Sequence, residues 1–224
     1  MNAVSERLES VHSKIAEAAT RAGRAPEEIE LIAVSKTHPP EAVAEAIEGG
    51  QTLFGESRVQ EARAKIPLIS GRARWHFIGH LQKNKIRHAL GLGFELFHGI
   101  DSIETAQDLN RIAGECGVYP NILLEVNVAG ESSKFGFSPA KIAAQMEPLL
   151  ALDRLQIEGV MTIAPLAVEA EASRRYFAAL RELREKLQSE FRVPLPKLSM
   201  GMSGDYAVAV EEGATLVRVG TAIR

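Results

Sequence analysis

Short apolar segments alternate with longer amphipathic stretches along the whole chain. Eight such apolar segments recur and have the length of buried strands, and helical stretches separate them. Strict alternation of strands and helices predicts a parallel sheet, and eight such units in one chain predict a closed (β/α)8 barrel. The predicted strands cover residues 29–36, 52–56, 75–79, 96–101, 121–128, 155–163, 197–202 and 215–221.

The helical stretches carry the boundary signals that helices need. Ser102 and Ser138 stand where N-terminal caps are expected, and Pro139 follows Ser138 at the first helical position. An additional amphipathic helix opens the chain, before the first predicted strand. Its predicted buried face consists of Val4, Leu8, Val11, Ile15 and Ala18.

An open, doubly wound sheet is the alternative architecture. It would need a glycine-rich phosphate-binding turn after the first strand, and residues 35–38 contain no glycine. No linker, low-complexity segment or repeat interrupts the pattern. We therefore predict a single domain over residues 1–224, a TIM barrel with an extra N-terminal helix.

Composition excludes several classes of partner. The net charge is −3, so no basic surface indicates binding to nucleic acid or to an anionic membrane. No apolar run reaches the roughly 18 residues of a membrane span, and the charged N-terminus is unlike a signal peptide. Cys116 is the single cysteine, which excludes an internal disulfide. We expect a cytoplasmic protein, and a monomer.

Lys36 is the leading candidate for chemistry. It ends the first predicted strand, and residues 37–40 then read Thr-His-Pro-Pro. An amine at the mouth of an apolar cavity is partly neutral and nucleophilic near pH 7, and its natural partner is an aldehyde or ketone, joined as a Schiff base. The alternative is that Lys36 only extends into solvent at the end of its strand.

Strand parity predicts two charged side chains inside the barrel. Arg218 alternates with Val217 and Val219, which suit packing against the outer helices, so Arg218 points inward. Glu125 alternates with apolar residues in the fifth predicted strand and also points inward. A buried guanidinium needs a ligand, water or carboxylate partner, so either Arg218 serves a ligand or the two residues form an internal ion pair.

The loops after the seventh and eighth predicted strands are rich in small residues. Barrel enzymes often bind phosphate there, because small residues let backbone N–H groups approach an anion. Ser199, Ser203, Gly220 and Thr221 lie in these loops, and a helix is expected to start near Asp205. Together with Lys36 and Arg218, this cluster suits a phosphorylated aldehyde.

Two histidines share one face of the third predicted strand. A metal site built on His76 and His80 lacks a third clustered ligand in the sequence, so we expect both rings to have hydrogen-bond partners instead. The basic residues of 83–88 and the alternating charges of 174–186 are typical of exposed helix faces.

Several motifs across nearly the whole chain match a known family. The chain resembles the pyridoxal phosphate homeostasis proteins, which consist of a barrel like that of alanine racemase. The matching segments are residues 33–36, Phe54-Gly55-Glu56, Val59-Gln60-Glu61, 75–82, 133–136, 159–162, 198–205 and 217–223.

The resemblance implies a cofactor and residue roles. Pyridoxal 5′-phosphate would be joined to Lys36 as a Schiff base, with Arg218 facing the pyridine nitrogen. Arginine beside that nitrogen disfavours its protonation and weakens the ring as an electron sink. The phosphate would be held by Ser199, Gly220 and Thr221 with Ser203, while Met161 and Ser57 stand at further cofactor-contact positions.

The chain departs from the family pattern in two places. Ser57-Arg58 replaces the usual Asn-Tyr, which removes an amide contact to the cofactor ring. After Ile223 and Arg224 the family usually continues with Phe-Gly, so we expect the eighth strand to be less well covered here.

The resemblance predicts a protein of intracellular pyridoxal phosphate homeostasis. It would bind, buffer or deliver the cofactor, with cofactor-dependent client enzymes as partners, and would not catalyse amino-acid reactions at an appreciable rate. The alternative is an amino-acid racemase or related lyase of low activity. Such an enzyme needs a second acid or base opposite Lys36, for which His80 and Glu56 are the strand-end candidates.

Overall fold

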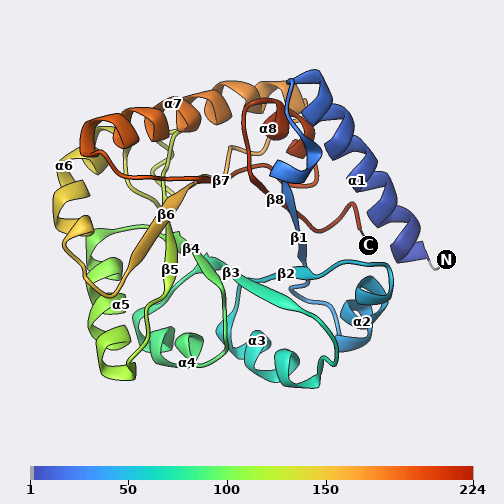
Figure 1. The fold of residues 1–224 in the computed structure, drawn as a ribbon, viewed down its shortest axis with the longest axis horizontal. Helices are drawn as coiled ribbons and strands as arrows, with labels where there is room; N and C mark the ends of the chain where they lie inside the picture. Colours follow the sequence, from blue (N-terminus) through green and yellow to red (C-terminus); the bar gives the residue numbers. More distant parts are fainter. Residues whose placement is uncertain (1–2, 224) are drawn as a thin grey trace.

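Eight parallel strands form a closed barrel, and helices surround it (Figure 1). The structure is a computed structural model that describes residues 3–223. Each strand pairs with its neighbours in chain order, and β8 closes the barrel against β1. The predicted (β/α)8 barrel is therefore confirmed.

All eight predicted strands are present, most of them slightly shorter than expected. The first strand ends at Val34, two residues before Lys36, and the seventh has only three residues. The strands are β1 (Glu30–Val34), β2 (Leu53–Glu56), β3 (Arg74–His80), β4 (Leu96–Ile100), β5 (Asn121–Glu125), β6 (Gln156–Met161), β7 (Lys197–Ser199) and β8 (Leu216–Val219).

The helices follow the strands in strict alternation after α1, the predicted extra helix. Ser102 and Ser138 cap their helices as expected, since each hydroxyl accepts a backbone N–H of the first turn. The helices are α1 (Ala3–Arg21), α2 (Pro40–Glu48), α3 (Val59–Lys65), α4 (Ile86–Leu90), α5 (Ile103–Cys116), α6 (Pro139–Leu150), α7 (Arg174–Phe191) and α8 (Tyr206–Glu211), with short 3-10 segments at Pro26–Glu28, Ile66–Leu68, Lys83–Lys85 and Ala170–Ser173.

The apolar core has two parts, one on each side of the sheet. The larger part lies between the strands and the helices and includes Val217 and Val219. A smaller cluster fills the inside of the barrel, so the barrel is a packed core rather than a channel. This inner cluster consists of Ile32, Leu53, Leu96, Leu123, Met161 and Leu216.

Helix α1 covers the region where the barrel closes. It packs against α2 and α8, and Leu8, Val11, Ile15 and Ala18 of its predicted face are buried, with Val4 half-buried (Figure 1). The expectation that the eighth strand is less well covered is wrong, because every residue of β8 is buried. Its outer residues Val217 and Val219 join the core between the sheet and the helices, and α8 packs against it.

The structure also tests the predictions made for the basic run of 83–88, for Cys116 and for membrane-spanning segments. The basic run of 83–88 falls on a 3-10 segment and on α4, where Ile86 is buried and the charged residues stay outside. Cys116 is exposed at the end of α5. Within residues 3–223, no helix combines the length and apolar character that crossing a membrane requires.

Candidate functional site at the C-terminal end of the barrel

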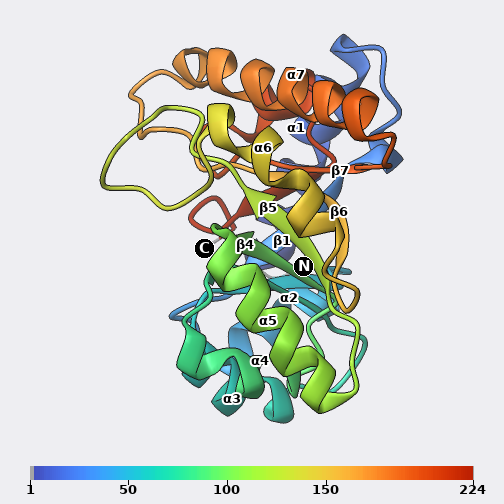
Figure 2. The ribbon, with the colours of Figure 1, turned by 90° about the vertical axis from the view of Figure 1, so that its left-hand side faces the viewer.

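The polar side chains expected to bind a ligand gather where the strands end. Lys36, Glu125 and Arg218 come from the carboxyl ends of β1, β5 and β8, and in a closed parallel barrel these ends surround one mouth. The long loops after β5 and β6 project from this region (Figure 2). They carry the exposed side chains of Phe135, Leu166 and Val168.

Lys36 lies on a turn directly after β1, rather than within the strand. Ser35 before it is buried, whereas Lys36 itself is exposed. Thr37 after it has a φ of 66°, in the left-handed region that β-branched residues rarely adopt. The end of β1 therefore places Lys36 at the mouth of the barrel, with a side chain that solvent can reach.

Arg218 points into the barrel, as strand parity predicted, and is 4% exposed. It donates one hydrogen bond to the hydroxyl of Ser199 and another, of 2.9 Å, to the carbonyl oxygen of Thr162. Among the described residues it forms no ion pair with Glu125, so the alternative of an internal pair is not what the structure shows. Two of its five N–H groups are used, which leaves donors for a ligand. Burial lowers the pKa of Arg218 to about 10, so the guanidinium stays charged at neutral pH.

A chain of hydrogen bonds continues from Arg218 through the barrel. Ser199 Oγ lies 2.9 Å from Nδ1 of His98, and Nε2 of His98 lies 3.0 Å from Nδ1 of His76. All three side chains are buried. Burial lowers the pKa of His76 to about 3 and that of His98 well below its usual range, so both rings are neutral.

His98 was missed by the sequence analysis, although a signal was present. Leu96 and His98 are two residues apart in one strand and therefore share a face. Leu96 belongs to the cluster inside the barrel. Strand parity alone would have placed His98 inside as well.

Ser199 and the other three predicted phosphate residues lie in different environments. Ser199 is fully buried, and its hydroxyl is bonded to Arg218 and His98. Ser203 and Gly220 are half-buried, and Thr221 is exposed. Ser203 Oγ accepts the N–H of Gly220 at 3.1 Å, which brings the loops after β7 and β8 together.

Gly201 allows the loop after β7 to pass close to α8. Its φ is +94°, and a Cβ there would lie 2.5 Å from the Cβ of Ala209. Only glycine fits this conformation and this approach. The backbone of the loop is therefore fixed beside Ser203, where small residues leave N–H groups accessible.

Three titratable residues lie at the ends of β3, β4 and β5. His80 Nδ1 is 2.7 Å from Oδ2 of Asp101, and the His80 ring stacks on Phe135 with centroids 4.0 Å apart. Burial, and then the neighbouring Asp101, raises the pKa of Glu125 to about 7. His76 and His80 thus have separate partners, as expected, and no metal-binding cluster occurs among residues 3–223.

Met161 and Ser57 are not equally accessible. Met161 is 1% exposed and belongs to the cluster inside the barrel, below the mouth. Ser57 is half-buried after β2 and lines a hollow with Arg58 and His80. A Cβ on Gly79 would lie 2.2 Å from the carbonyl oxygen of Ser57, so the two chain segments touch there.

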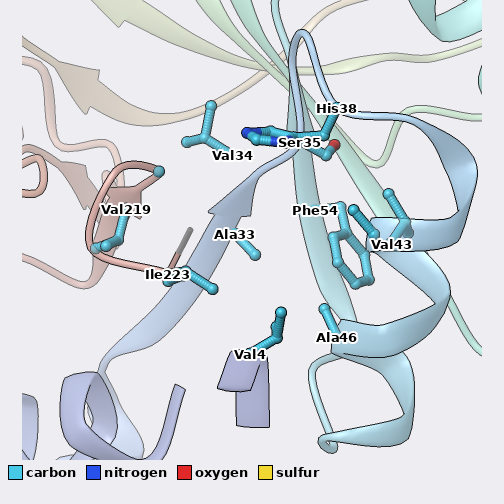
Figure 3. A pocket seen from close by; sticks show the side chains of 12 residues that line it. Val4, Ala33, Val34, Ser35, His38, Val43, Ala46, Phe54, Val219 and Ile223 are labelled. Carbon is cyan, nitrogen blue, oxygen red and sulfur yellow. The ribbon is translucent and has the colours of Figure 1, made fainter. Parts of the chain in front are cut away.

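A separate apolar pocket lies outside the barrel (Figure 3). It is bounded by β1, β2, α2, the start of α1 and the last residues described, and Ser35 and His38 stand at its edge. Gly220, one of the predicted phosphate residues, also lines this pocket, and a Cβ on it would lie 3.4 Å from the Cβ of Val34. The lining contains no lysine or arginine, so we do not assign the phosphate to this pocket, although it shares Gly220 with the candidate site.

Sequence comparisons match this chain over nearly its full length. The alanine racemase N-terminal domain family matches residues 7–223. The pyridoxal phosphate homeostasis protein of Aquifex aeolicus is 43% identical over 222 residues, which cover 99% of this chain and 96% of the relative. The protein of the same name from Escherichia coli K12 is 40% identical over 228 residues, covering 100% and 96%. The chain belongs to the pyridoxal phosphate homeostasis protein family.

Solved structures of this family have the same barrel. PipY of Synechococcus elongatus with pyridoxal phosphate bound is 40% identical, with a TM-score of 0.86 over 98% of this chain and 99% of that one. An alanine racemase of Clostridium difficile has a TM-score of 0.73 at 18% identity. That likeness concerns the fold alone, and 97% of this chain matches 56% of the racemase.

Proposed function

We propose that this protein binds pyridoxal 5′-phosphate through Lys36 and acts in pyridoxal phosphate homeostasis, by binding, buffering or delivering the cofactor. The observation that carries the proposal is the combination of an exposed amine, a buried guanidinium and a small-residue loop pair at one barrel mouth. Family membership and the bound cofactor of PipY support it.

The donor set fits the three functional groups of the cofactor. An aldehyde condenses with the amine of Lys36 and releases one water. The free donors of Arg218 suit a pyridine nitrogen, which accepts a hydrogen bond when unprotonated. Ser203 and Thr221 offer hydroxyl donors for a phosphate, while the N–H of Gly220 is already donated to Ser203 Oγ and holds the two loops together. The hydroxyl of Ser199 is already bonded to Arg218 and His98, so we assign it to holding the guanidinium.

We further propose that the protein does not run amino-acid chemistry at an enzymatic rate. When bound, the cofactor supplies an electron sink, and a charged Arg218 beside the pyridine nitrogen weakens that sink. Racemisation also needs an acid and a base on opposite faces of the substrate carbon. The tyrosines do not supply the second group from a strand end, because Tyr119 lies before β5, Tyr176 on α7 and Tyr206 on α8.

A low-activity racemase or lyase is the second candidate function. It is favoured by the titratable groups at the mouth: the His80–Asp101 pair, and Glu125 with its raised pKa. Glu56, the other strand-end candidate, is fully buried and bonded to Lys65. A chiral assay with alanine decides: turnover near about 1 s⁻¹, the low end of typical enzymes, would establish this function instead.

Absorption spectroscopy with chemical trapping tests cofactor binding directly. The purified protein is incubated with pyridoxal phosphate, and its visible spectrum is recorded before and after borohydride, which delivers hydride to an imine carbon and makes the link permanent. Peptide mass mapping should then locate the pyridoxyl group on Lys36. Label found mainly on Lys134 or Lys197 would contradict the assignment.

The monomeric state, the cytoplasmic location and the client enzymes stay predictions from the sequence. Size-exclusion chromatography with light scattering measures the first. Transfer to a cofactor-free enzyme, followed by the activity that this enzyme gains, measures delivery.

A further inference from the structure

A second lysine is buried directly behind the Lys36 turn. Lys65, at the end of α3, has a side chain that is 5% exposed. Its Nζ donates to the carbonyl oxygen of Ser35 at 2.7 Å, to Glu56 Oε1 at 2.6 Å and to Glu61 Oε1 at 3.2 Å. All three hydrogen bonds expected of an ammonium group are therefore made, and one of them reaches the residue before Lys36.

The carboxylates of Glu56 and Glu61 form hydrogen bonds with the residues on both sides of Lys36. Glu56 Oε1 also accepts the hydroxyl of Ser35 at 2.7 Å. Glu61 Oε1 accepts the backbone N–H of Thr37, the residue after Lys36. Lys65, Glu56 and Glu61 thus hold the main chain or side chain of both neighbours of Lys36, while the Lys36 side chain itself stays exposed.

The conformation of Thr37 explains why the turn needs such support. A left-handed φ of 66° is sterically disfavoured for a β-branched residue, because Cβ approaches the following carbonyl. The hydrogen bond from its N–H to Glu61 favours this conformation over the extended ones. Without this hydrogen bond, Thr37 would adopt a different backbone conformation. The amine of Lys36 would then occupy a different position before it reacts with the aldehyde.

Stability alone is a poor explanation for this buried cluster. Glu56 is fully buried, and burial raises its pKa even though Lys65 and Ser35 oppose that effect. Replacing a buried ion pair by apolar residues of similar volume is often neutral or stabilising. A cluster that holds both sides of one exposed residue is better explained by the placement of that residue.

We propose that Lys65, with Glu61 and Glu56, is a positioning group that sets the direction in which Lys36 approaches the aldehyde. This inference rests on the proposed function, since it concerns the covalent step at Lys36. Lys65 itself does not react, because its amine is fully hydrogen-bonded and enclosed.

Comparing two ligands shows whether a variant changes only the position of Lys36 or disrupts the whole binding site. Pyridoxal phosphate carries the aldehyde. Pyridoxine 5′-phosphate carries an alcohol there and binds only through the ring and the phosphate. A positioning role predicts loss with the first ligand and unchanged affinity for the second, whereas general disruption of the mouth affects both.

Variants at Glu61 give the sharpest comparison. Its side chain is 23% exposed, so Glu61→Ala leaves no large cavity. Glu61→Gln keeps a carbonyl oxygen that can accept the N–H of Thr37, and Arg63→Ala changes an exposed residue on the same helix. Lys65→Met, combined with Glu56→Gln so that no charge is left buried, removes the other half of the cluster.

We expect Glu61→Ala to slow borohydride-trappable attachment to Lys36 by about 100-fold, the effect of misplacing a reactive group by about 1 Å. Glu61→Gln and Arg63→Ala should react like the wild type, and all three should bind pyridoxine 5′-phosphate unchanged. If the double variant folds, it should behave like Glu61→Ala. If it does not fold, the comparison of Glu61→Ala with Glu61→Gln tests the positioning role.

Three results would overturn the inference. They are attachment at the wild-type rate in Glu61→Ala, equal loss for both ligands in that variant, and label on Lys65 in the wild type. Absence of any attachment in the wild type would instead refute the proposed function, and the inference with it.

Discussion

Arg218 donates a hydrogen bond to the hydroxyl of Ser199 inside the barrel, and this bond favours one arrangement of the protons on the two histidines that follow. A guanidinium can only donate, so Ser199 Oγ accepts. In the described part of the chain the hydroxyl has one other partner, Nδ1 of His98, and its buried O–H is satisfied when it donates a hydrogen bond to that nitrogen. His98 then donates from Nε2 to Nδ1 of His76. In this arrangement both rings carry their proton on Nε2.

The histidine tautomers give the first prediction. Long-range ¹H–¹⁵N spectra of the ligand-free protein should show two neutral rings, each protonated on Nε2. Because burial lowers both pKa values, neither signal should shift as the pH passes about 6.5, the usual histidine value. A proton on Nδ1 of His98 would show that the chain runs in another direction.

Variants of His98 extend this prediction to the ligand. His98→Asn keeps an oxygen near the position of Nδ1, whereas His98→Leu removes the acceptor. In His98→Leu the side chains of Ser199 and Arg218 are no longer held in place. The variant should therefore bind both pyridoxal and pyridoxal phosphate more weakly, by about 1–3 kcal/mol. Titration calorimetry measures both ligands. Loss confined to the phosphorylated ligand would place this network at the phosphate instead.

The third prediction concerns Lys36. Lys36→Ala should keep the thermal unfolding midpoint, because an exposed side chain contributes little to the core. It should lose the borohydride-trapped label while still binding pyridoxine 5′-phosphate. Full labelling of the variant at another lysine would mean that the reactive amine lies elsewhere.

Thr221 provides a test of the phosphate position. Thr221→Val keeps the side-chain shape and removes a hydroxyl donor, a loss of roughly 1–3 kcal/mol if the bond goes to a charged group. Pyridoxal phosphate should bind more weakly, and pyridoxal should be little affected. Equal weakening of both ligands would argue against a phosphate-specific role.

Glu125 predicts a pH dependence of stability. Its pKa rises from the ordinary glutamate value of 4.5 to about 7 in the folded protein. The folded state therefore holds the proton more tightly, and stability from this group is full below pH 4.5 and is lost as the pH rises to about 7. The rise in pKa corresponds to roughly 3 kcal/mol.

Glu125→Gln should remove this contribution, because its amide stays neutral. Chemical unfolding of both proteins between about pH 4 and 8, a range that spans both pKa values, measures the difference. The variant should gain stability relative to the wild type as the pH increases, with most of the change below the folded-state pKa of about 7. A constant difference would show that Glu125 has an ordinary pKa in the folded state.

Much of the barrel was predictable because apolar periodicity records which residues face a core. All eight strands were found, and alternation within β8 placed Arg218 inside and Val217 and Val219 outside. Strand ends were less predictable. Lys36 continues the apolar run of β1 in sequence, but the left-handed Thr37 turns the chain after Val34.

The sequence named candidate residues one by one, and it did not predict the hydrogen bonds that connect them. Ser199 and Ser203 look alike in a small-residue loop, yet one is buried on Arg218 and the other joins two loops at the mouth. Lys65 ends α3 like any surface lysine, and its burial depends on Glu56 from β2. These hydrogen bonds join different helices and strands. The periodicity of apolar residues along a single element does not predict them.

The contact between Gly79 and Ser57 limits the path that the chain can take after β2. The main chain at Ser57 is confined by the neighbouring strand, since nothing larger than a hydrogen fits on Gly79 beneath its carbonyl. The path of this segment is therefore constrained by its contact with β3 and not by the side chains at 57 and 58. The side chains at 57 and 58 can therefore change while the main chain keeps its path, so that substitutions at these two positions alter what is presented to a ligand without altering the barrel.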